Sequence, residues 1–218
     1  MNKRKWLMFA APYLLAIAVG IWFYFIYSQL PSTVPLHWNS AGTPDRFAGR
    51  SSLIYLLLLT MVIPVMMDLL PYIDPRRQNY RYFADSYQKI KLGTSCFMVF
   101  VFYLSVNTAL SPSQKLSTSI MSVGLGILFM LIGNYLAKVK NNYFVGIKTP
   151  WTLASDEVWR KTHRLGGWLF FIAGLITLIS GQLITGESLF PIFLVVILMA
   201  ALVPIIYSFL IYRRLFTK

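Results

Sequence analysis

The sequence predicts an all-α, polytopic membrane protein with six transmembrane helices. Of its 218 residues, 57% are apolar and only 12% are charged, and the mean hydropathy is +0.62. Soluble domains are typically about 45–50% apolar and about 25% charged, so both fractions indicate an integral membrane protein. Six apolar runs set the number of spans, since each is near the ~20 residues that a helix needs to cross the hydrocarbon core.

These runs follow one another along the whole chain. They cover residues 6–27, 53–72, 92–110, 116–137, 167–184 and 190–212. Helix is the expected form of each, because lipid cannot satisfy backbone polar groups and the runs lack the alternation of barrel strands. The first run has a basic start, as a signal peptide does. It is longer than the ~7–15 apolar residues of a signal sequence, so we expect it to be retained as a span.

Lysine and arginine residues predict the orientation of the spans. Seventeen of the 20 lie at the two termini and in the connections after the second and fourth spans, and the other three are Arg46, Arg50 and Lys115. Because basic residues gather on the cytoplasmic side, both termini and residues 138–167 are predicted to be cytoplasmic, and residues 30–52 external. Basic clusters beside apolar runs are topology signals, so the net charge of +13 does not predict direct nucleic-acid binding.

The external loop, residues 30–52, has the composition of an ordered loop. Three prolines exclude regular helix and favour extended or turn backbone, and residues 39–42 form a turn signal. Long ordered loops are often functional. The alternative is that its aromatic residues, Trp38 and Phe47, only anchor the loop at the membrane interface.

Two features inside the spans predict how the helices pack. Asp68 is the ionisable residue that lies well inside a span, and it is either part of an interfacial ion pair with Arg76 or Arg77 or part of a proton or ion relay. Small residues recur on one face of the fourth span and of the fifth span. Because small residues let membrane helices approach closely, we predict that these two spans pack together.

The longest polar interruption in the second half of the chain is the motif segment, residues 138–167. It contains two tryptophans and a histidine, His163. Ser155 is a suitable N-cap and is followed by two acidic residues, which favours a helix start at this point. We expect a short amphipathic helix on the inner leaflet, ended by the glycines at 166–167. His163 is expected to partner an acidic residue of this helix or a lipid phosphate.

Two stretches of the sequence resemble one known family. The run GIKTPWTLASDEVWRKTHRLGG, with Asn141 or Asn142 before it, resembles the signature of the SdpI immunity-protein family. The run LPSTVPLHWNSAGTPDRF is similar to the membrane domain of unknown function that often precedes it. We therefore expect an N-terminal membrane region, residues 1–110, with spans one to three, and an SdpI-like region, residues 111–218, with spans four to six.

The resemblance implies a function by binding. The family's best-known member protects bacteria from their own secreted killing peptide, and it is described as holding a transcriptional repressor at the membrane. A multi-pass immunity protein of the bacterial cell membrane is therefore implied, whose partners are the lipid bilayer, a toxic peptide and a cytoplasmic repressor. The candidate peptide-binding residues outside are His37, Trp38, Asn39 and Asp45. The candidate partner-binding residues inside are Asn142, Gly146, Lys148, Pro150, Trp151, Trp159 and His163, of which Gly146 and Pro150 are those most expected to serve folding.

The main alternative is a small transporter or channel, for which Asp68, Asn107 and Asn134 would supply the polar path. An enzyme is not expected, because the sequence has no metalloprotease, hydrolase or phosphate-binding motif. No cofactor or metal is expected, since the two histidines are predicted on opposite sides of the membrane and the single cysteine, Cys96, lies in an apolar run.

Overall fold

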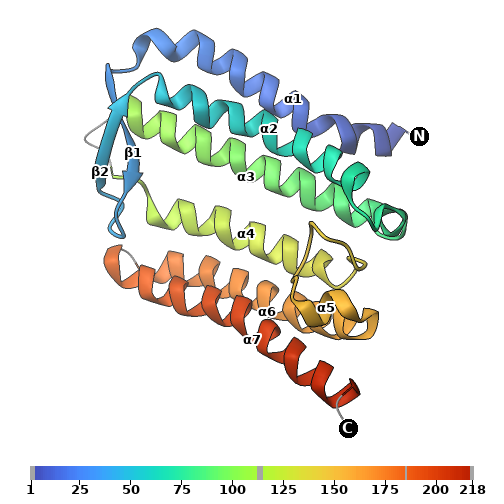
Figure 1. Ribbon diagram of the computed structural model, residues 1–218. Coiled ribbons are helices and arrows are strands. Elements are labelled where there is room, and N and C mark those ends of the chain that lie inside the picture. Colours follow the sequence, from blue (N-terminus) through green and yellow to red (C-terminus); the bar gives the residue numbers. More distant parts are fainter. Residues whose placement is uncertain (1–2, 112–114, 185, 217–218) are drawn as a thin grey trace.

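Six long helices lie side by side in the computed structural model, which describes residues 3–111, 115–184 and 186–216 (Figure 1). They are α1 (Lys3–Ile26), α2 (Ser52–Ile73), α3 (Ala84–Leu110), α4 (Thr118–Leu136), α6 (Asp156–Leu183) and α7 (Leu189–Phe216). All six are long and apolar enough to cross a membrane. The predicted fold class, a helical membrane protein with six spans, is therefore confirmed.

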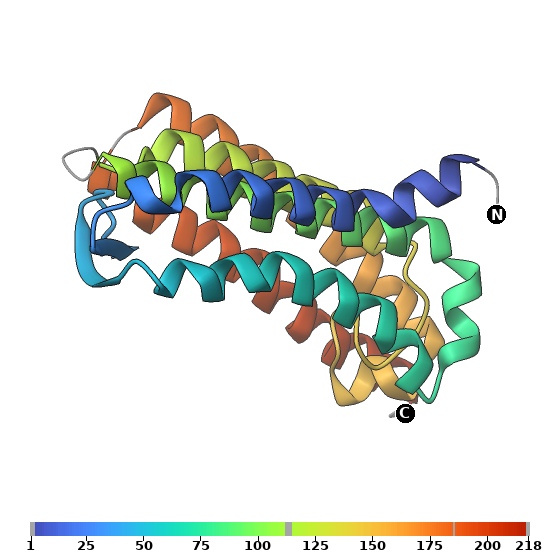
Figure 2. The same cartoon turned by 90° about the horizontal axis from the view of Figure 1, so that it is seen from above.

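Short elements connect these helices at the two ends of the bundle. They are the 3₁₀ turns η1 (Tyr27–Gln29), η2 (Arg77–Tyr82) and η3 (Gly186–Ser188), the strands β1 (Thr33–Trp38) and β2 (Pro44–Gly49), and the short helix α5 (Pro150–Ala154). The β1–β2 hairpin lies at one end, which we call the hairpin end (Figure 1). The start of α1, the motif segment with α5, and the end of α7 lie at the other, the terminal end (Figure 2). The two unusual connectors are thus at opposite ends of the bundle, and the compartment that each faces stays a prediction.

Helices α4 and α6 meet through glycines. A methyl group added at Gly126 would lie 2.7 Å from the carbonyl oxygen of Gly174, and one added at Gly174 would lie 2.5 Å from the carbonyl oxygen of Gly126. Gly133 and Gly167 face each other in the same way, because a methyl group at Gly133 would lie 2.6 Å from the Gly167 carbonyl oxygen. These distances leave no room for a side chain. The prediction that the fourth and fifth spans pack together through small residues is therefore confirmed.

A buried ion pair joins α2 to α3. The Lys91 ammonium group lies 2.8 and 2.9 Å from the two carboxylate oxygens of Asp68, and the hydroxyl of Tyr13 in α1 donates to the same carboxylate. The prediction that Asp68 pairs with Arg76 or Arg77 is wrong. The physical reason is that α3 begins eight residues before its apolar run and turns Lys91 inward, where its side chain is fully buried. Asp68 is therefore not alone as an ionisable group inside a span.

The start of α6 also differs from the sequence prediction. The helix is continuous from Asp156 to Leu183, so the two glycines at 166–167 do not end it. The residues buried in its first turns are Val158, Trp159, Thr162 and His163. This face lies under the motif segment: a methyl group at Gly166 would lie only 2.4 Å from the Cδ1 atom of Ile147. The predicted helix on the membrane surface is therefore wrong, because its less polar face is covered by protein.

Candidate functional site

The hairpin is a two-stranded antiparallel sheet whose turn is held by Asn39. The strands pair along their length, with an irregular register around His37. The Oδ1 atom of Asn39 accepts hydrogen bonds from the backbone N–H groups of Ala41 and Thr43, both at 3.0 Å. An asparagine side chain that bonds the backbone two residues later is a standard means of fixing a turn. Asn39 therefore sets the shape of the loop.

The tip of the hairpin is fixed to the segment that leads into α4. The backbone N–H of Leu116 donates to the carbonyl oxygen of Gly42 at 2.9 Å. Gly42 has a φ of +75°, and a methyl group there would lie 2.2 Å from the Leu116 carbonyl oxygen. At the base of the hairpin, the Arg50 guanidinium donates to the Leu30 carbonyl oxygen at 3.2 Å and lies over the ring of Tyr27. The hairpin thus extends from the first two helices to the second half of the chain.

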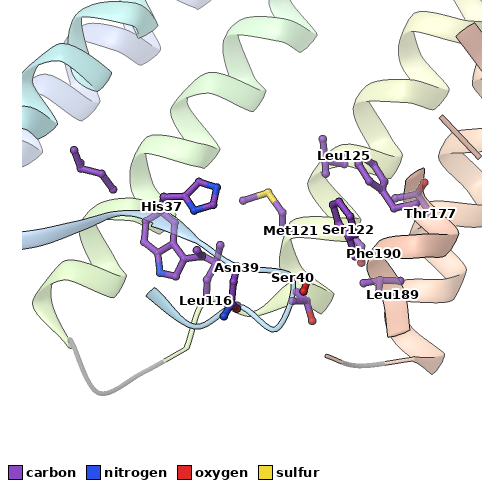
Figure 3. Close-up of a pocket in the computed structure, with 15 residues that line it drawn as sticks. His37, Asn39, Ser40, Leu116, Met121, Ser122, Leu125, Thr177, Leu189 and Phe190 are labelled. Carbon is purple, nitrogen blue, oxygen red and sulfur yellow. The ribbon is translucent and has the colours of Figure 1, made fainter. Parts of the chain in front are cut away.

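A largely apolar pocket of about 310 Å³ lies where the hairpin meets α4, α6 and α7 (Figure 3). Its hairpin wall includes His37, Trp38 and Asn39. Its helical wall is formed by Met121, Ser122 and Leu125 of α4, Thr177 of α6, and Leu189, Phe190 and Phe193 of α7. Three of the four external candidates from the sequence therefore line one pocket.

Two polar groups of the hairpin bear on what this pocket could bind. The Nε1 atom of Trp38 is buried and has no hydrogen-bond partner among the residues that the structure describes. The fourth candidate, Asp45, lies outside the pocket lining, where its Oδ1 atom is 2.6 Å from Nδ1 of His37. Apolar pockets with a few placed polar groups are the usual form of ligand sites. Trp38 contributes apolar ring surface to the pocket lining, while its N–H is enclosed by protein.

At the terminal end, the motif segment folds over a buried polar network that the sequence analysis missed. The Asp74 carboxylate, at the end of α2, is only 2% exposed and accepts hydrogen bonds from the Tyr80 hydroxyl and the Tyr143 backbone N–H, both at 3.0 Å. Burial, followed by the hydrogen bond to Asp74, raises the pKa of Tyr80 far above its ordinary value, so its hydroxyl remains a donor. The signal in the sequence was an acidic residue directly after the second span.

Asn142 holds the irregular part of the motif segment in shape. Its Oδ1 atom accepts hydrogen bonds from the backbone N–H groups of Phe144 and Val145, at 2.9 and 2.7 Å. Its Nδ2 atom donates to the carbonyl oxygens of Lys140 and Val145, at 2.8 and 2.9 Å. The side chain is fully buried. Because both ends of the amide are satisfied inside the protein, Asn142 acts on the loop's conformation.

Trp159 and His163 form the floor beneath this segment. Their rings stack with centroids 3.9 Å apart, and their exposed fractions are 2% and 0%. The Nε1 atom of Trp159 donates to the Val139 carbonyl oxygen at 2.8 Å, and Nε2 of His163 accepts from the Ile147 backbone N–H at 3.0 Å. A ring nitrogen that accepts carries no proton, so the imidazole is neutral and is protonated at Nδ1. The expected partners of His163, an acidic side chain or a lipid phosphate, are wrong, since backbone groups occupy both of its nitrogens.

Gly146 and Pro150 allow the chain to pass close over the His163 ring and then to begin α5. Gly146 has a φ of +122°, and a methyl group there would lie 2.3 Å from Nε2 of His163. Pro150 is the first residue of α5, where the Thr149 and Thr152 side chains complete a capping box. Proline suits this position because its missing N–H would have no partner there.

The remaining candidates of the motif segment differ in exposure. Lys148 is exposed, and its ammonium group donates to the carbonyl oxygen of Phe144 at 2.9 Å. Pro150 is also exposed, and Trp151 is half-buried against Phe209, with ring centroids 4.9 Å apart. Among these candidates, exposed surface is therefore found on Lys148, Pro150 and Trp151, whereas Asn142, Trp159 and His163 are buried.

We next considered whether the described residues form a metal site or a polar path through the bundle. In the described parts of the chain, no group of three or more His, Cys, Asp or Glu side chains is arranged to hold a metal ion. Of the three side chains considered for a polar path, Asp68 is paired with Lys91, and Asn107 and Asn134 are exposed on the bundle. These three residues therefore do not converge on a shared polar path.

Known families and proteins match both regions that carry these features. Residues 138–208 match the SdpI/YfhL protein family, and residues 13–62 match a domain of unknown function, DUF1648. Both resemblances found in the sequence are thereby confirmed. The chain is 26% identical over 192 residues to the immunity protein SdpI of Bacillus subtilis (strain 168). The matched region covers 87% of this chain and 88% of that protein. It is also 43% identical over 56 residues, 25% of this chain and 30% of the other, to an uncharacterized protein of Archaeoglobus fulgidus. No solved structure matches.

Proposed function

We propose that this chain, whose residues 138–208 match the SdpI/YfhL family, is a membrane immunity protein that counters a secreted antimicrobial peptide. The similarity to an immunity protein extends over 87% of the chain and includes both the hairpin and the motif segment. An immunity protein acts by binding, and the two polar ends of the helical bundle are its candidate binding surfaces. We assign the peptide to the hairpin end.

The pocket at the hairpin end is the observation that carries this assignment. Both matched regions contribute to it, since the hairpin forms one wall and α6 and α7, together with α4, form the other. A peptide that enters membranes must carry apolar side chains, and burying one of these in the pocket would remove it from lipid or water. The indole of Trp38 lines this pocket and offers apolar surface against which such a side chain can pack.

Orientation supports the same assignment. The excess of lysine and arginine at the terminal end predicts that the hairpin end faces outward, where a secreted peptide arrives. Bound there, the peptide would contact α4 and α7 as well as the hairpin, and its apolar surface would no longer be free to insert into the bilayer.

Expression in a sensitive bacterium tests this proposal. Cells that make the chain are challenged with secreted killing peptides, and growth is compared at equal amounts of protein in the membrane. Trp38→Ala, in the pocket wall, should lose protection. Phe47→Ala is the matched control, because Phe47 lies on the other strand, is 58% exposed and does not line the pocket.

The outcomes separate two claims. Full protection by Trp38→Ala would contradict the assignment of the peptide to the pocket, but it would not contradict the immunity function. If the unaltered chain protected against none of the peptides, the immunity function itself would be contradicted.

We further propose that the terminal end recruits a cytoplasmic transcriptional repressor when peptide is bound. The exposed residues Lys148, Pro150 and Trp151 form the candidate contact. Recruitment of this kind requires that the peptide and the repressor favour the same conformation of the bundle. Membranes from peptide-treated cells should then retain more of the repressor than membranes from untreated cells, and Trp151→Ala should abolish the difference. Equal retention with and without peptide would contradict the coupling.

A further inference from the structure

The two halves of the bundle are joined by hydrogen bonds at both ends. At the hairpin end, the Leu116 N–H donates to the Gly42 carbonyl oxygen at 2.9 Å. At the terminal end, the side-chain amide of Asn79 donates to the carbonyl oxygen of Asn141 at 2.7 Å, and the carboxylate of Asp74 receives the Tyr143 N–H. Between these two attachments, the halves face each other along α3 and α4.

An apolar groove of about 610 Å³ lies between α3 and α4. Its apolar lining includes Leu92, Phe97, Ile127 and Leu128. The two helices already touch at two points along it. A methyl group at Gly93 would lie 2.7 Å from the side chain of Leu131, and one at Gly124 would lie 2.2 Å from the ring of Phe100. Because α3 and α4 are already in contact at these points, a further helix, about 10–12 Å across with its side chains, cannot lie between them, whereas a much thinner hydrocarbon chain can lie along the groove.

Two lysines lie near Tyr135 at the terminal end of this groove. The ammonium groups of Lys89 and Lys138 each lie 4.9 Å from the centroid of the Tyr135 ring, and Lys89 and Tyr135 line the groove. Neither lysine has an acidic side chain within salt-bridge distance among the described residues. Two positive charges near one ring repel each other, and an anion bound beside Tyr135 would be attracted by both.

The length of the groove corresponds to one leaflet. Its lining on α3 runs from Lys89 to Phe100, which are eleven residues apart in the sequence. At ~1.5 Å per residue this is about 16 Å, close to half of the ~30 Å hydrocarbon core. A slot that occupied one leaflet would place the positive charges where its headgroups begin and would extend toward the middle of the membrane.

We propose that this groove binds an anionic phospholipid, with one acyl chain in the slot between α3 and α4 and the phosphate at Lys89 and Lys138. Basic pockets between membrane helices at the cytoplasmic surface are the recurrent form of such sites, and phosphate accepts charge-assisted hydrogen bonds from lysine. The lipid fills the region where the halves are not bonded to each other. Its role is independent of the peptide site at the hairpin end.

The chain's single cysteine supplies a reporter for this site. Cys96 is exposed and lines the groove, so a bimane fluorophore can be attached there alone. The labelled protein is reconstituted in zwitterionic phosphatidylcholine, and phospholipids with brominated acyl chains are added as quenchers. Brominated phosphatidylglycerol should quench at about tenfold lower mole fraction than brominated phosphatidylcholine. Lys89→Gln with Lys138→Gln should remove this preference.

Lys3→Gln with Lys140→Gln is the matched control, because both lysines are exposed at the terminal end and the net charge changes equally. This variant should keep the preference. Native mass spectrometry of the unlabelled protein provides a second readout, in which co-purified phosphatidylglycerol should be retained by the control and lost by the double variant. Inorganic phosphate should not relieve the quenching.

Three results would overturn the proposal. Equal quenching by the two brominated lipids would mean that the groove holds ordinary bilayer lipid. A preference that survived Lys89→Gln with Lys138→Gln would place the anion elsewhere. Relief of quenching by inorganic phosphate would assign the lysines to a free anion and not to a lipid headgroup.

Discussion

The ammonium group of Lys91 is fully buried and lies within 2.9 Å of both carboxylate oxygens of Asp68, on the neighbouring helix. The Phe9 ring lies 4.5 Å below the ammonium group, and the Tyr13 hydroxyl donates to the carboxylate. Removal of either charge would leave the other without its partner in a largely buried site. The pair therefore couples α1, α2 and α3 to each other.

Asp68→Asn should destabilise the protein by about 3–5 kcal/mol, because it leaves the Lys91 ammonium buried without a countercharge. Asp68→Leu combined with Lys91→Met should recover much of the loss, since an apolar pair needs no desolvation of charge. Thermal unfolding in detergent measures both effects.

The exposed pair of Glu157 and Lys161, 2.7 Å apart, supplies the control for that experiment. Glu157→Gln should leave the unfolding temperature almost unchanged, because an i,i+4 ion pair on the surface contributes little to stability. Equal losses of stability for Asp68→Asn and Glu157→Gln would show that burial does not make the Lys91 pair more important for stability than an exposed ion pair.

The sequence predicted what depends on local composition. Runs of apolar residues located the six helices, and the spacing of glycines such as Gly126 and Gly174 predicted that the fourth and fifth spans pack together. It did not predict contacts that depend on the tertiary fold. Lys91 precedes an apolar run, so composition placed it in a connection, and only the packing of α3 against α2 turns it inward. Pairing of β1 with β2 was missed because prolines suggested irregular extended backbone.

The candidate sites show the same division. Trp38 and its neighbours were recognised as an unusual loop, but the helical wall of the pocket comes from residues that read as plain membrane span, such as Phe190 and Phe193. In the motif segment, Trp159 and His163 were singled out by residue type. Their role in supporting Gly146 and Ile147 became visible only when the loop was folded over them.

Gly174→Ala should destabilise the bundle by about 1–3 kcal/mol or more, because the added methyl group would lie 2.5 Å from the Gly126 carbonyl oxygen and 2.6 Å from the Met130 nitrogen. Both are backbone atoms, so the clash cannot be relieved by a side-chain rotation. Gly20→Ala in α1 is the matched control, since a methyl group there meets no atom within 4 Å. Unfolding in detergent should separate the two variants, and equal stability would contradict the close packing of α4 and α6.

Gly146→Ala should destabilise the motif segment for two reasons. Its φ of +122° is strained for alanine, and the added methyl group would lie 2.3 Å from Nε2 of His163. Gly186→Ala isolates the first effect, because Gly186 has a φ of +73° and open space around its Cβ position. We expect Gly146→Ala to cost about 1–3 kcal/mol more than Gly186→Ala. Faster amide hydrogen exchange across residues 140–150 in Gly146→Ala alone would locate the damage, and unchanged exchange there would show that the His163 floor does not hold the loop.

Labelling of single cysteines tests the orientation on which the assignment of the two ends depends. In a Cys96→Ser background, Ser40→Cys places a thiol on the exposed turn of the hairpin, and Ala154→Cys places one on the exposed end of α5. The charge asymmetry predicts that a membrane-impermeant maleimide labels Ser40→Cys in intact cells and Ala154→Cys only after permeabilisation. The two sites lie at opposite ends of a bundle of six membrane-length helices, so they cannot both be outside while those helices span the bilayer. Labelling of Ala154→Cys alone in intact cells would invert the orientation, and a secreted peptide would then meet the motif segment and not the pocket beside Trp38.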